Sequence, residues 1–260
     1  MKVLVLSDVH SNIFALEAIW THEQTADMIL CAGDLVDYGT HPLETLSWLI
    51  DHKAICVLGN HDQCLIETYK NGRFSEKFIP PQDFKWVHHN CNNLTPDSVD
   101  YLENLPISVS LTFDGFFYIM RHHSLMGYNT VESLMQFETL WQQLKKPDIQ
   151  NDQDKPRRFI FGHTHLQRLN HLSPFCEWLN PGSASYRRPH DPDKNAHYAI
   201  IQDGNIQLKT VPYDRVSPFH IVEQLIVNKA MMPTELQDAA FFFGNALTTR
   251  DPLPEIEVLQ

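Results

Sequence analysis

The first sixty residues alternate short apolar runs with helix-like segments, and this alternation constrains the fold more than any other feature. The runs Lys2–Leu6, Met28–Cys31 and Ala54–Leu58 are too short for helices and carry the aliphatic residues of buried strands. Ile13–Glu23 repeats apolar residues at helical spacing, and a second helix is expected over Pro42–His52. Strands joined by helical crossovers run parallel, so the sequence predicts an α/β fold.

The clearest hairpin of the chain lies further along. Ile107–Phe113 alternates in hydrophobicity, Asp114-Gly115 is typical of a type I′ turn, and Phe116–Arg121 is the expected return strand. Further strands are expected at Arg158–Phe161, Cys176–Leu179, His197–Gln202 and Ile206–Val211. Helices are expected at Val131–Leu144 and from Ser217 onward, with a second C-terminal helix opening at Pro233.

Polar clusters follow the predicted strands, where ligands gather in parallel α/β sheets. They are Asp8-x-His10, Gly33-Asp34-x-x-Asp37, Gly59-Asn60-His61-Asp62, His122-His123, Gly162-His163-Thr164-His165 and Asn180-Pro181-Gly182-Ser183. Any one histidine among the 15 in the chain is more often a surface residue than a ligand. The recurrence of Asp, Asn and His after successive strands nevertheless indicates one shared site.

The donor types in these clusters indicate the class of metal. They offer carboxylate oxygens, an amide oxygen and imidazole nitrogens without a thiolate, which suits Mn, Fe, Zn, Co or Ni. Seven candidate ligands are too many for one ion and are right for two ions that share a carboxylate. Two such ions about 3.5–4 Å apart can activate one water for attack on a phosphoryl group.

Composition disfavours a nucleic-acid-binding, a disulfide-bonded or a membrane-spanning protein. The net charge of −12 and the lack of a basic cluster disfavour binding to a nucleic-acid polymer. Five cysteines without a C-x-x-C pair suit a reduced cytoplasmic protein. We expect no signal peptide and no membrane span, because no window approaches the roughly 18 apolar residues that a span needs.

The motifs D-x-H, G-D-x-x-D, G-N-H-D, H and G-H-x-H, in this order, resemble those of the calcineurin-like metallophosphoesterase superfamily. The resemblance covers roughly residues 1–215 and points to the small prokaryotic phosphodiesterase branch. It implies a four-layer αββα sandwich of two mixed β-sheets flanked by helices. It also implies a single domain over residues 1–260, with a motif-bearing core to about residue 215 and a helical extension over about 216–260.

The resemblance also implies roles for individual residues. The first metal would be bound by Asp8, His10, Asp34 and His165, and the second by Asp34, Asn60, His122 and His163. His61 would be the general acid, oriented by Asp37, while Asp62 is expected to be a structural carboxylate. If the backbone at His163 and His165 is extended, their side chains point to one side, toward both metals.

Two further positions carry weaker expectations about substrate binding. His123 replaces the glycine of the H-G-S sequence that is usual in the branch, and it either reaches the substrate or turns outward. Arg188 stands where the branch keeps an arginine, which could clamp a phosphate oxygen; the alternative is an exposed loop residue.

The resemblance implies hydrolysis of small phosphodiesters or nucleotide-type phosphoanhydrides by a metal-bridging hydroxide, with manganese as the expected metal. A Ser/Thr protein phosphatase is the alternative, although that branch has arginine at the position of Tyr38 and glutamate at that of Asp62. A non-catalytic scaffold is a further alternative, but such proteins lose ligands or the acid histidine, and here every position is filled. The sequence alone does not identify the substrate, the native metal, the oligomeric state or the role of the C-terminal helices.

Overall fold

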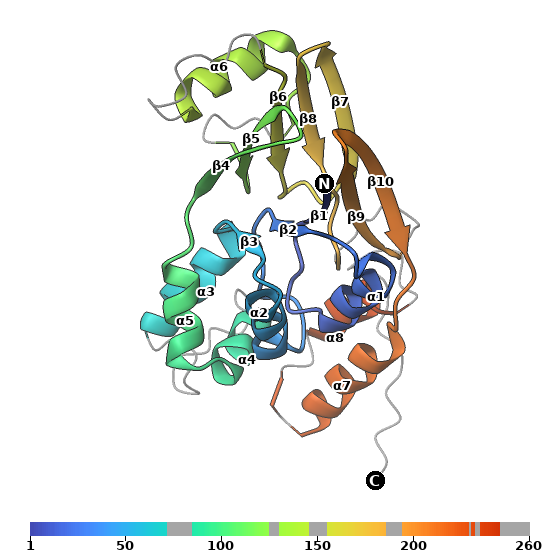
Figure 1. Cartoon of the computed structure of the whole chain (residues 1–260). Coiled ribbons are helices and arrows are strands. Elements are labelled where there is room, and N and C mark those ends of the chain that lie inside the picture. The colour runs from blue at the N-terminus through green and yellow to red at the C-terminus, as the bar shows by residue number, and fades with distance from the viewer. Residues whose placement is uncertain are drawn as a thin grey trace.

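Two five-stranded mixed sheets form the centre of the computed structural model (Figure 1). The structure describes residues 1–71, 85–124, 130–145, 155–185, 194–228, 230–231 and 235–244. The first sheet has the order β10-β9-β1-β2-β3, with β1 at Lys2–Leu6, β2 at Met28–Cys31, β3 at Ile55–Cys56, β9 at Ala196–Gln202 and β10 at Asn205–Val211. The second has the order β4-β5-β6-β8-β7, with β4 at Ser108–Phe113, β5 at Phe116–Arg121, β6 at Arg157–Phe161, β7 at Arg168–Ser173 and β8 at Cys176–Asn180.

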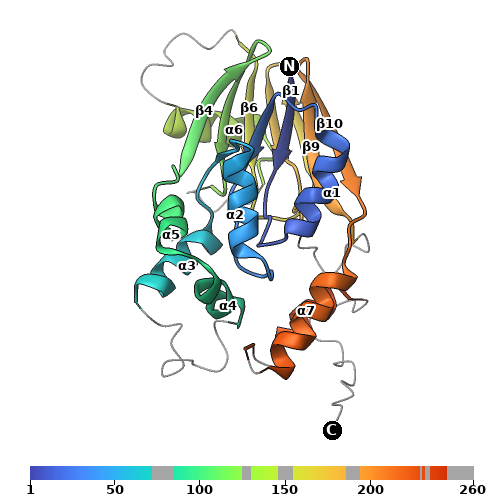
Figure 2. The same cartoon turned by 60° about the horizontal axis from the view of Figure 1, so that its bottom comes forward.

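In the first sheet, β1, β2 and β3 run parallel, as the alternation of strand and helix predicted. The crossover helices are α1 (Ile13–Glu23) and α2 (Pro42–Asp51), which lie side by side on one face of the sheet (Figure 2). The side chain of Asn12 starts α1, because its oxygen accepts a hydrogen bond from the Ala15 amide at 3.2 Å. Strand β3 is shorter than predicted and ends at Cys56.

The second sheet repeats this arrangement, with β5, β6 and β8 parallel. The predicted hairpin of β4 and β5 is confirmed, and Asp114 and Gly115 have φ angles of 50° and 80°, as a type I′ turn requires. Strand β7 was not predicted. It lies at the edge of the sheet and is exposed or half-buried along its length, so its sequence, RLNHLS, has no apolar alternation.

Alternate residues of β1 divide between two cores. Val3 and Val5 face the second sheet, whereas Leu4 and Leu6 pack against the helices on the outer face of the first. The helix α6 (Leu134–Leu144) covers the far face of the second sheet, with Trp141 in its core. The layers are therefore helix, sheet, sheet and helix, which confirms the predicted α/β sandwich.

The remaining helices gather below the first sheet in Figure 1. They are α3 (Asn60–Lys70), α4 (Lys85–Asn93), α5 (Pro96–Glu103), α7 (Val216–Val227) and α8 (Glu235–Phe242). The aromatic residues at the end of α8 are buried against Trp86 of α4 and against α7, so the C-terminal helices pack on the part of the chain that carries the motifs. Pro233 lies outside the described residues, and the domain limits expected from the sequence stay a prediction.

Candidate active site

The candidate site lies where three parallel strands of the first sheet and two of the second end. Asp8 and His10 follow β1, Asp34 and Asp37 follow β2, Asn60 and His61 open α3 after β3, His122 and His123 follow β5, and His163 and His165 follow β6. The structure brings these ten predicted residues together, as the contacts below establish. Arg188 lies outside the described residues.

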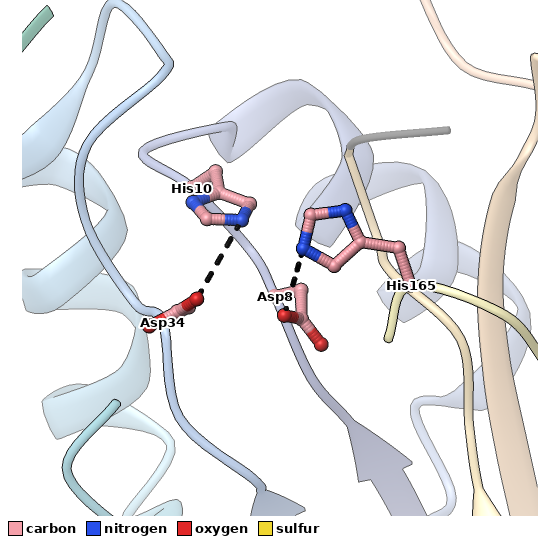
Figure 3. Close-up of side chains that lie close together, drawn as sticks. All are labelled: Asp8, His10, Asp34 and His165. Carbon is pink, nitrogen blue, oxygen red and sulfur yellow. Dashed lines mark ion pairs between the residues drawn. The ribbon is translucent and has the colours of Figure 1, made fainter. Parts of the chain in front are cut away.

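A first group joins Asp8, His10, Asp34 and His165. One ligand atom from each lies within 4.8 Å of the others, and all four residues are buried. The Nε2 atom of His165 is 3.1 Å from Oδ1 of Asp8, and that of His10 is 3.9 Å from Oδ2 of Asp34 (Figure 3). These four residues form a compact set of oxygen and nitrogen donors.

A second group is centred on the amide oxygen of Asn60. This Oδ1 atom lies 2.9 Å from Nε2 of His122 and 2.9 Å from Nδ1 of His163. The Nε2 atom of His122 is also 3.1 Å from Oδ2 of Asp34. The Asp34 carboxylate therefore contacts both groups.

Backbone groups orient several of these donors. The Nδ1 atom of His122 lies 2.7 Å from the carbonyl oxygen of Ala32, and that of His10 lies 3.3 Å from that of Val36. A ring whose Nδ1–H donates to a carbonyl presents its Nε2 lone pair to a metal. Asp8 is fixed in turn, because its Oδ2 accepts a hydrogen bond from the Ser7 hydroxyl at 2.5 Å.

The backbone at the site is strained. Six of the candidate residues have positive φ angles between 51° and 72°, a region that side-chain-bearing residues seldom adopt: Asp8, His10, Asp34, Asp37, His163 and His165. Such strain persists only where the surrounding structure holds it, and it clusters at functional sites. The expectation of an extended backbone at His163 and His165 is wrong. Both residues are left-handed, and the turn itself sends their side chains to different groups.

The glycines of two motifs are needed because the loops touch. A Cβ atom added at Gly59 would collide with the backbone and carboxylate of Asp34. A Cβ atom at Gly162 would collide with the hydroxyl of Ser7 and lie 2.9 Å from the Asp8 carboxylate. Glycine at these two places allows loops from neighbouring strands to bring their ligands together.

Asp62 holds two of these loops to each other. It accepts hydrogen bonds from the amides of Leu35 at 2.8 Å and Val36 at 3.1 Å through Oδ1, and from that of Gly59 at 2.9 Å through Oδ2. Burial and the nearby charge of Asp34 raise its pKa to about 7. Its contacts are those of a structural carboxylate.

His61 has a different environment from the ligand candidates. Its Nδ1 atom lies 2.7 Å from Oδ2 of Asp37, and its backbone amide donates to Oδ1 of Asp34 at 2.9 Å. Burial lowers its pKa, but the hydrogen bond to Asp37 and the charge of Asp34 outweigh burial and raise the pKa to about 9. With 22% of its side chain exposed, the ring is oriented by a carboxylate and still reachable.

Two buried carboxylates of the site, those of Asp8 and Asp34, interact strongly with its histidines. Burial alone would raise the pKa of Asp34, yet His122 lowers it below its ordinary value, and His165 does the same for Asp8. Burial opposes the charged form of His122 too, but Asp34 raises its pKa to about 10. In contrast, burial lowers the pKa of His163 to about 4. Two buried anions among imidazole and amide donors suit a divalent cation.

His123 lies beside the site. Its ring centroid is 5.3 Å from that of His163 and 5.7 Å from that of His122, and the side chain is half-buried. Its Nδ1 atom is buried and has no hydrogen-bond partner among the described residues. The side chain is therefore directed toward the neighbouring histidines, while its role toward a substrate stays a prediction.

Asn90 of α4 supports the site and carries no sequence signal. Its Oδ1 accepts hydrogen bonds from the Ser11 hydroxyl at 2.5 Å and from the Asp37 amide at 3.1 Å. Its Nδ2 donates to the carbonyl oxygens of Gly39 and Trp86, each at 3.1 Å. A polar residue on the buried face of a helix is the one feature that could have drawn attention to it.

The sixth polar cluster of the sequence supports the others from β8. Asn180 donates from Nδ2 to the carbonyl oxygen of Gly162 at 2.7 Å, and the Ser183 hydroxyl donates to that of Asp8 at 2.7 Å. These bonds tie the loop after β8 to the loops that carry Asp8 and His163.

This fold and site define a metallophosphoesterase, and comparison with known proteins identifies the family. The family model described as calcineurin-like phosphoesterase matches residues 1–207. The chain therefore belongs to the calcineurin-like phosphoesterases and is a metal-dependent phosphoesterase. Membership and the buried Asp and His donors together indicate that it binds divalent metal.

Solved structures agree with the fold. A metallophosphoesterase from Sphaerobacter thermophilus is 22% identical, with a TM-score of 0.67 over 93% of this chain and 99% of that one. The hypothetical protein PH1004 from Pyrococcus horikoshii OT3 is 16% identical, with a TM-score of 0.69 over 94% of this chain and 98% of that one. Both place the two-sheet architecture within the same fold.

Two curated relatives differ in how much of the chain they match. The uncharacterized protein MJ0912 of Methanocaldococcus jannaschii is 26% identical over 231 residues, which are 82% of this chain and 88% of that protein. A symmetrical bis(5'-nucleosyl)-tetraphosphatase of Pseudomonas putida is 47% identical over 47 residues, which are 17% of this chain and 16% of that enzyme. In the described part of the chain, none of the helices has the length and apolar character needed to cross a membrane.

Proposed function

We propose that the protein hydrolyses small phosphodiesters or nucleotide-type phosphoanhydrides with two divalent transition-metal ions, manganese first among them. The observation that carries the proposal is the position of the Asp34 carboxylate. Its Oδ2 atom lies 3.1 Å from Nε2 of His122 and 3.9 Å from Nε2 of His10, so it adjoins both donor groups. One carboxylate between two sets of donors suits a pair of neighbouring ions.

The proposed ligand sets follow the two groups. Asp8, His10, Asp34 and His165 would hold one ion, and Asp34, Asn60, His122 and His163 the other. Ions held there would act as Lewis acids on the phosphoryl oxygens and would lower the pKa of a bound water.

His61 is the proposed general acid. With Nδ1 held 2.7 Å from Asp37, its Nε2 is the ring atom left to serve a substrate. As the bond between phosphorus and the leaving oxygen breaks, that oxygen keeps the electron pair and takes the proton from Nε2 of His61. The incoming hydroxide supplies the new bond to phosphorus, so the products are a phosphate monoester and an alcohol, or two phosphates from an anhydride.

Charge and sequence narrow the substrate class. The net charge of −12 opposes a polymeric polyanion and favours a small ester that reaches a local cationic site. The 47-residue match to a tetraphosphatase supports the inclusion of dinucleoside polyphosphates among the candidates, although it spans only 16% of that enzyme. Tyr38 stands at the position where protein phosphatases have arginine, so the alternative of a Ser/Thr phosphatase gains no support here. Arg188 and His123 as substrate contacts, and a cytoplasmic location, stay predictions.

The test is a panel of substrates assayed with added Mn²⁺. It compares p-nitrophenyl phosphate, bis-p-nitrophenyl phosphate, cyclic nucleotides, dinucleoside polyphosphates and a phosphopeptide. We expect turnover of a diester or of a dinucleoside polyphosphate, and its loss in Asp34→Asn. Preferential hydrolysis of the phosphopeptide would instead assign the protein phosphatase function, and inactivity of the metal-loaded protein on every substrate would refute the proposal.

A further inference from the structure

We propose that the C-terminal helix α8 is part of the catalytic centre, where Phe242 holds Tyr38 and Tyr38 positions His61. The inference rests on the proposed function, because it assigns His61 the role of acid. It gives a role to helices that carry no motif, and it makes Tyr38 and Phe242 positioning residues for the transfer of the proton.

Tyr38 acts on both members of the His61–Asp37 pair. Its ring centroid lies 4.7 Å from that of His61, with the planes tilted by 56°. Its backbone amide donates a hydrogen bond to Oδ1 of Asp37 at 2.9 Å, while Oδ2 of the same carboxylate faces His61. Tyr38 therefore fixes the carboxylate that orients the acid and also limits the tilt of the imidazole ring.

The conformation of Tyr38 needs outside support. Its φ angle is 54°, which is unfavourable for a residue with a side chain and persists only when packing holds it. The ring of Phe242 supplies such packing, because its centroid lies 5.4 Å from that of Tyr38 at an interplanar angle of 78°. This edge-to-face geometry is the favourable one for aromatic pairs.

Helix α8 is itself fastened at the end that carries Phe242. Arg215 donates from Nη1 to the carbonyl oxygens of Phe243 at 3.1 Å and Gly244 at 2.9 Å. Lys194 donates from Nζ to that of Phe241 at 2.6 Å. Cations at the last carbonyls of a helix satisfy acceptors that have no partner within the helix. The position of Phe242 is thus determined by residues from two other parts of the chain.

Two substrates with different leaving groups can show whether Phe242 positions the acid or only supports the fold. A nitrophenolate departs without a proton, whereas the alkoxide of a dinucleoside monophosphate needs one. We expect Phe242→Ala to lower turnover of a dinucleoside monophosphate by about 10-fold or more, which is part of the roughly 10²–10⁴-fold that a general acid contributes, and that of bis-p-nitrophenyl phosphate far less. Metal content, measured by elemental analysis, should not change. Tyr38→Phe retains the ring and should keep the ratio of the two rates near that of the wild type.

The control is Phe219→Leu, which changes another aromatic residue, on α7, that packs near Phe242. Among the described residues, the ring of Phe219 contacts that of His220. This variant should leave the ratio unchanged. In a His61→Ala background, Phe242→Ala should cause no further loss, because the acid through which it acts is gone. If Phe242→Ala does not fold, Phe242→Leu, which keeps most of the volume without the ring, makes the same test.

Two results would overturn the inference while the proposed function stands. One is an equal fall for both diesters, which would mean that α8 supports the fold alone; the other is a Phe242→Ala variant that turns over both diesters at the wild-type rate. A wild-type protein that is inactive on both diesters would overturn the proposed function, and the inference with it.

Discussion

Asn90 and Asp37 are joined by a hydrogen bond of 3.1 Å that links α4 to the loop after β2, across 53 positions of the sequence. The same side-chain oxygen of Asn90 accepts a hydrogen bond from the Ser11 hydroxyl, and its Nδ2 atom donates one to the carbonyl oxygen of Gly39. One fully buried side chain thus ties together the two loops that carry His10 and the partner of His61.

Asn90→Ala should destabilise the protein and impair the acid. The change leaves the Asp37 amide and the Gly39 carbonyl without their partner, and each such buried group costs about 1–3 kcal/mol. The free energy of unfolding in urea measures the loss. Asn92→Ala, at an exposed position of the same helix, is the control and should change stability by less than about 0.5 kcal/mol. Equal stability of the two variants would contradict the role of Asn90.

The number of metal ions should follow the two donor groups. Elemental analysis of the purified protein should find close to two divalent transition-metal ions per chain. His165→Ala and Asn60→Ala should each reduce this toward one, because each removes a donor from a different group. His22→Ala, at an exposed position on α1, is the matched control. Metal-free protein that added Mn²⁺ does not activate would count against the site.

His61→Ala should separate chemistry from metal binding. Since His61 serves as acid and not as ligand in the proposed scheme, the variant should keep its metal and lose about 10²–10⁴-fold in turnover of a diester with a poor leaving group. Asp37→Asn should lose less, because it keeps a polar partner for Nδ1. Steady-state kinetics on matched metal-loaded samples measure both. Loss of metal from His61→Ala would show that the residue is a ligand.

Asp62→Ala should be among the most destabilising changes near the site. Three buried amides, those of Leu35, Val36 and Gly59, would lose their acceptor, at about 1–3 kcal/mol each before the structure relaxes. Asp62→Asn keeps one acceptor oxygen and should cost less. The melting temperatures of both variants measure these losses, and Asp51→Ala, at the exposed end of α2, is the control. A lower melting temperature for Asp51→Ala than for either Asp62 variant would refute this account.

Gly59→Ala should disrupt the site through a steric clash alone. The added methyl group would occupy the space of the Asp34 backbone and carboxylate, so the loops after β2 and β3 must move apart. Lower metal affinity, measured by calorimetric titration of the metal-free protein with Mn²⁺, is the expected result. Gly115→Asn is the control, because the space around Gly115 is open and asparagine tolerates its φ angle of 80°. Unchanged affinity in Gly59→Ala would contradict the steric argument.

The order of strands and clusters can be predicted because local patterns determine it. The strand Lys2–Leu6 is apolar after its first residue, and Asp8 and His10 appear shortly after it ends, so both the sheet and its ligand edge can be predicted from the sequence. The same reasoning misses β7, whose edge position removes the apolar alternation. It also gives the wrong backbone at His163 and His165, because a left-handed turn depends on contacts with the loop that carries Asp8.

The residues that support the site are harder to predict from the sequence than the candidate ligands are. Asn90, Tyr38 and Phe242 support the site through neighbours that are distant in sequence. The sequence around each of them does not indicate which neighbours these are. Asp62 was readable as a structural carboxylate because it sits within a motif, whereas its three amide partners follow only from the way the loops meet. Tertiary contacts of this kind require the folded chain.

The donor groups follow strands of both sheets, and the backbone amide of His163, in the loop after β6, donates a hydrogen bond to Asp8, in the loop after β1 and 155 positions away. An ion bound by residues from both sheets would link two loops that are separated by a very long segment of polypeptide. Parting of the two sheets would then have to expel the ion, so loading with metal should slow amide exchange in the apolar layer between the sheets, well away from any ligand.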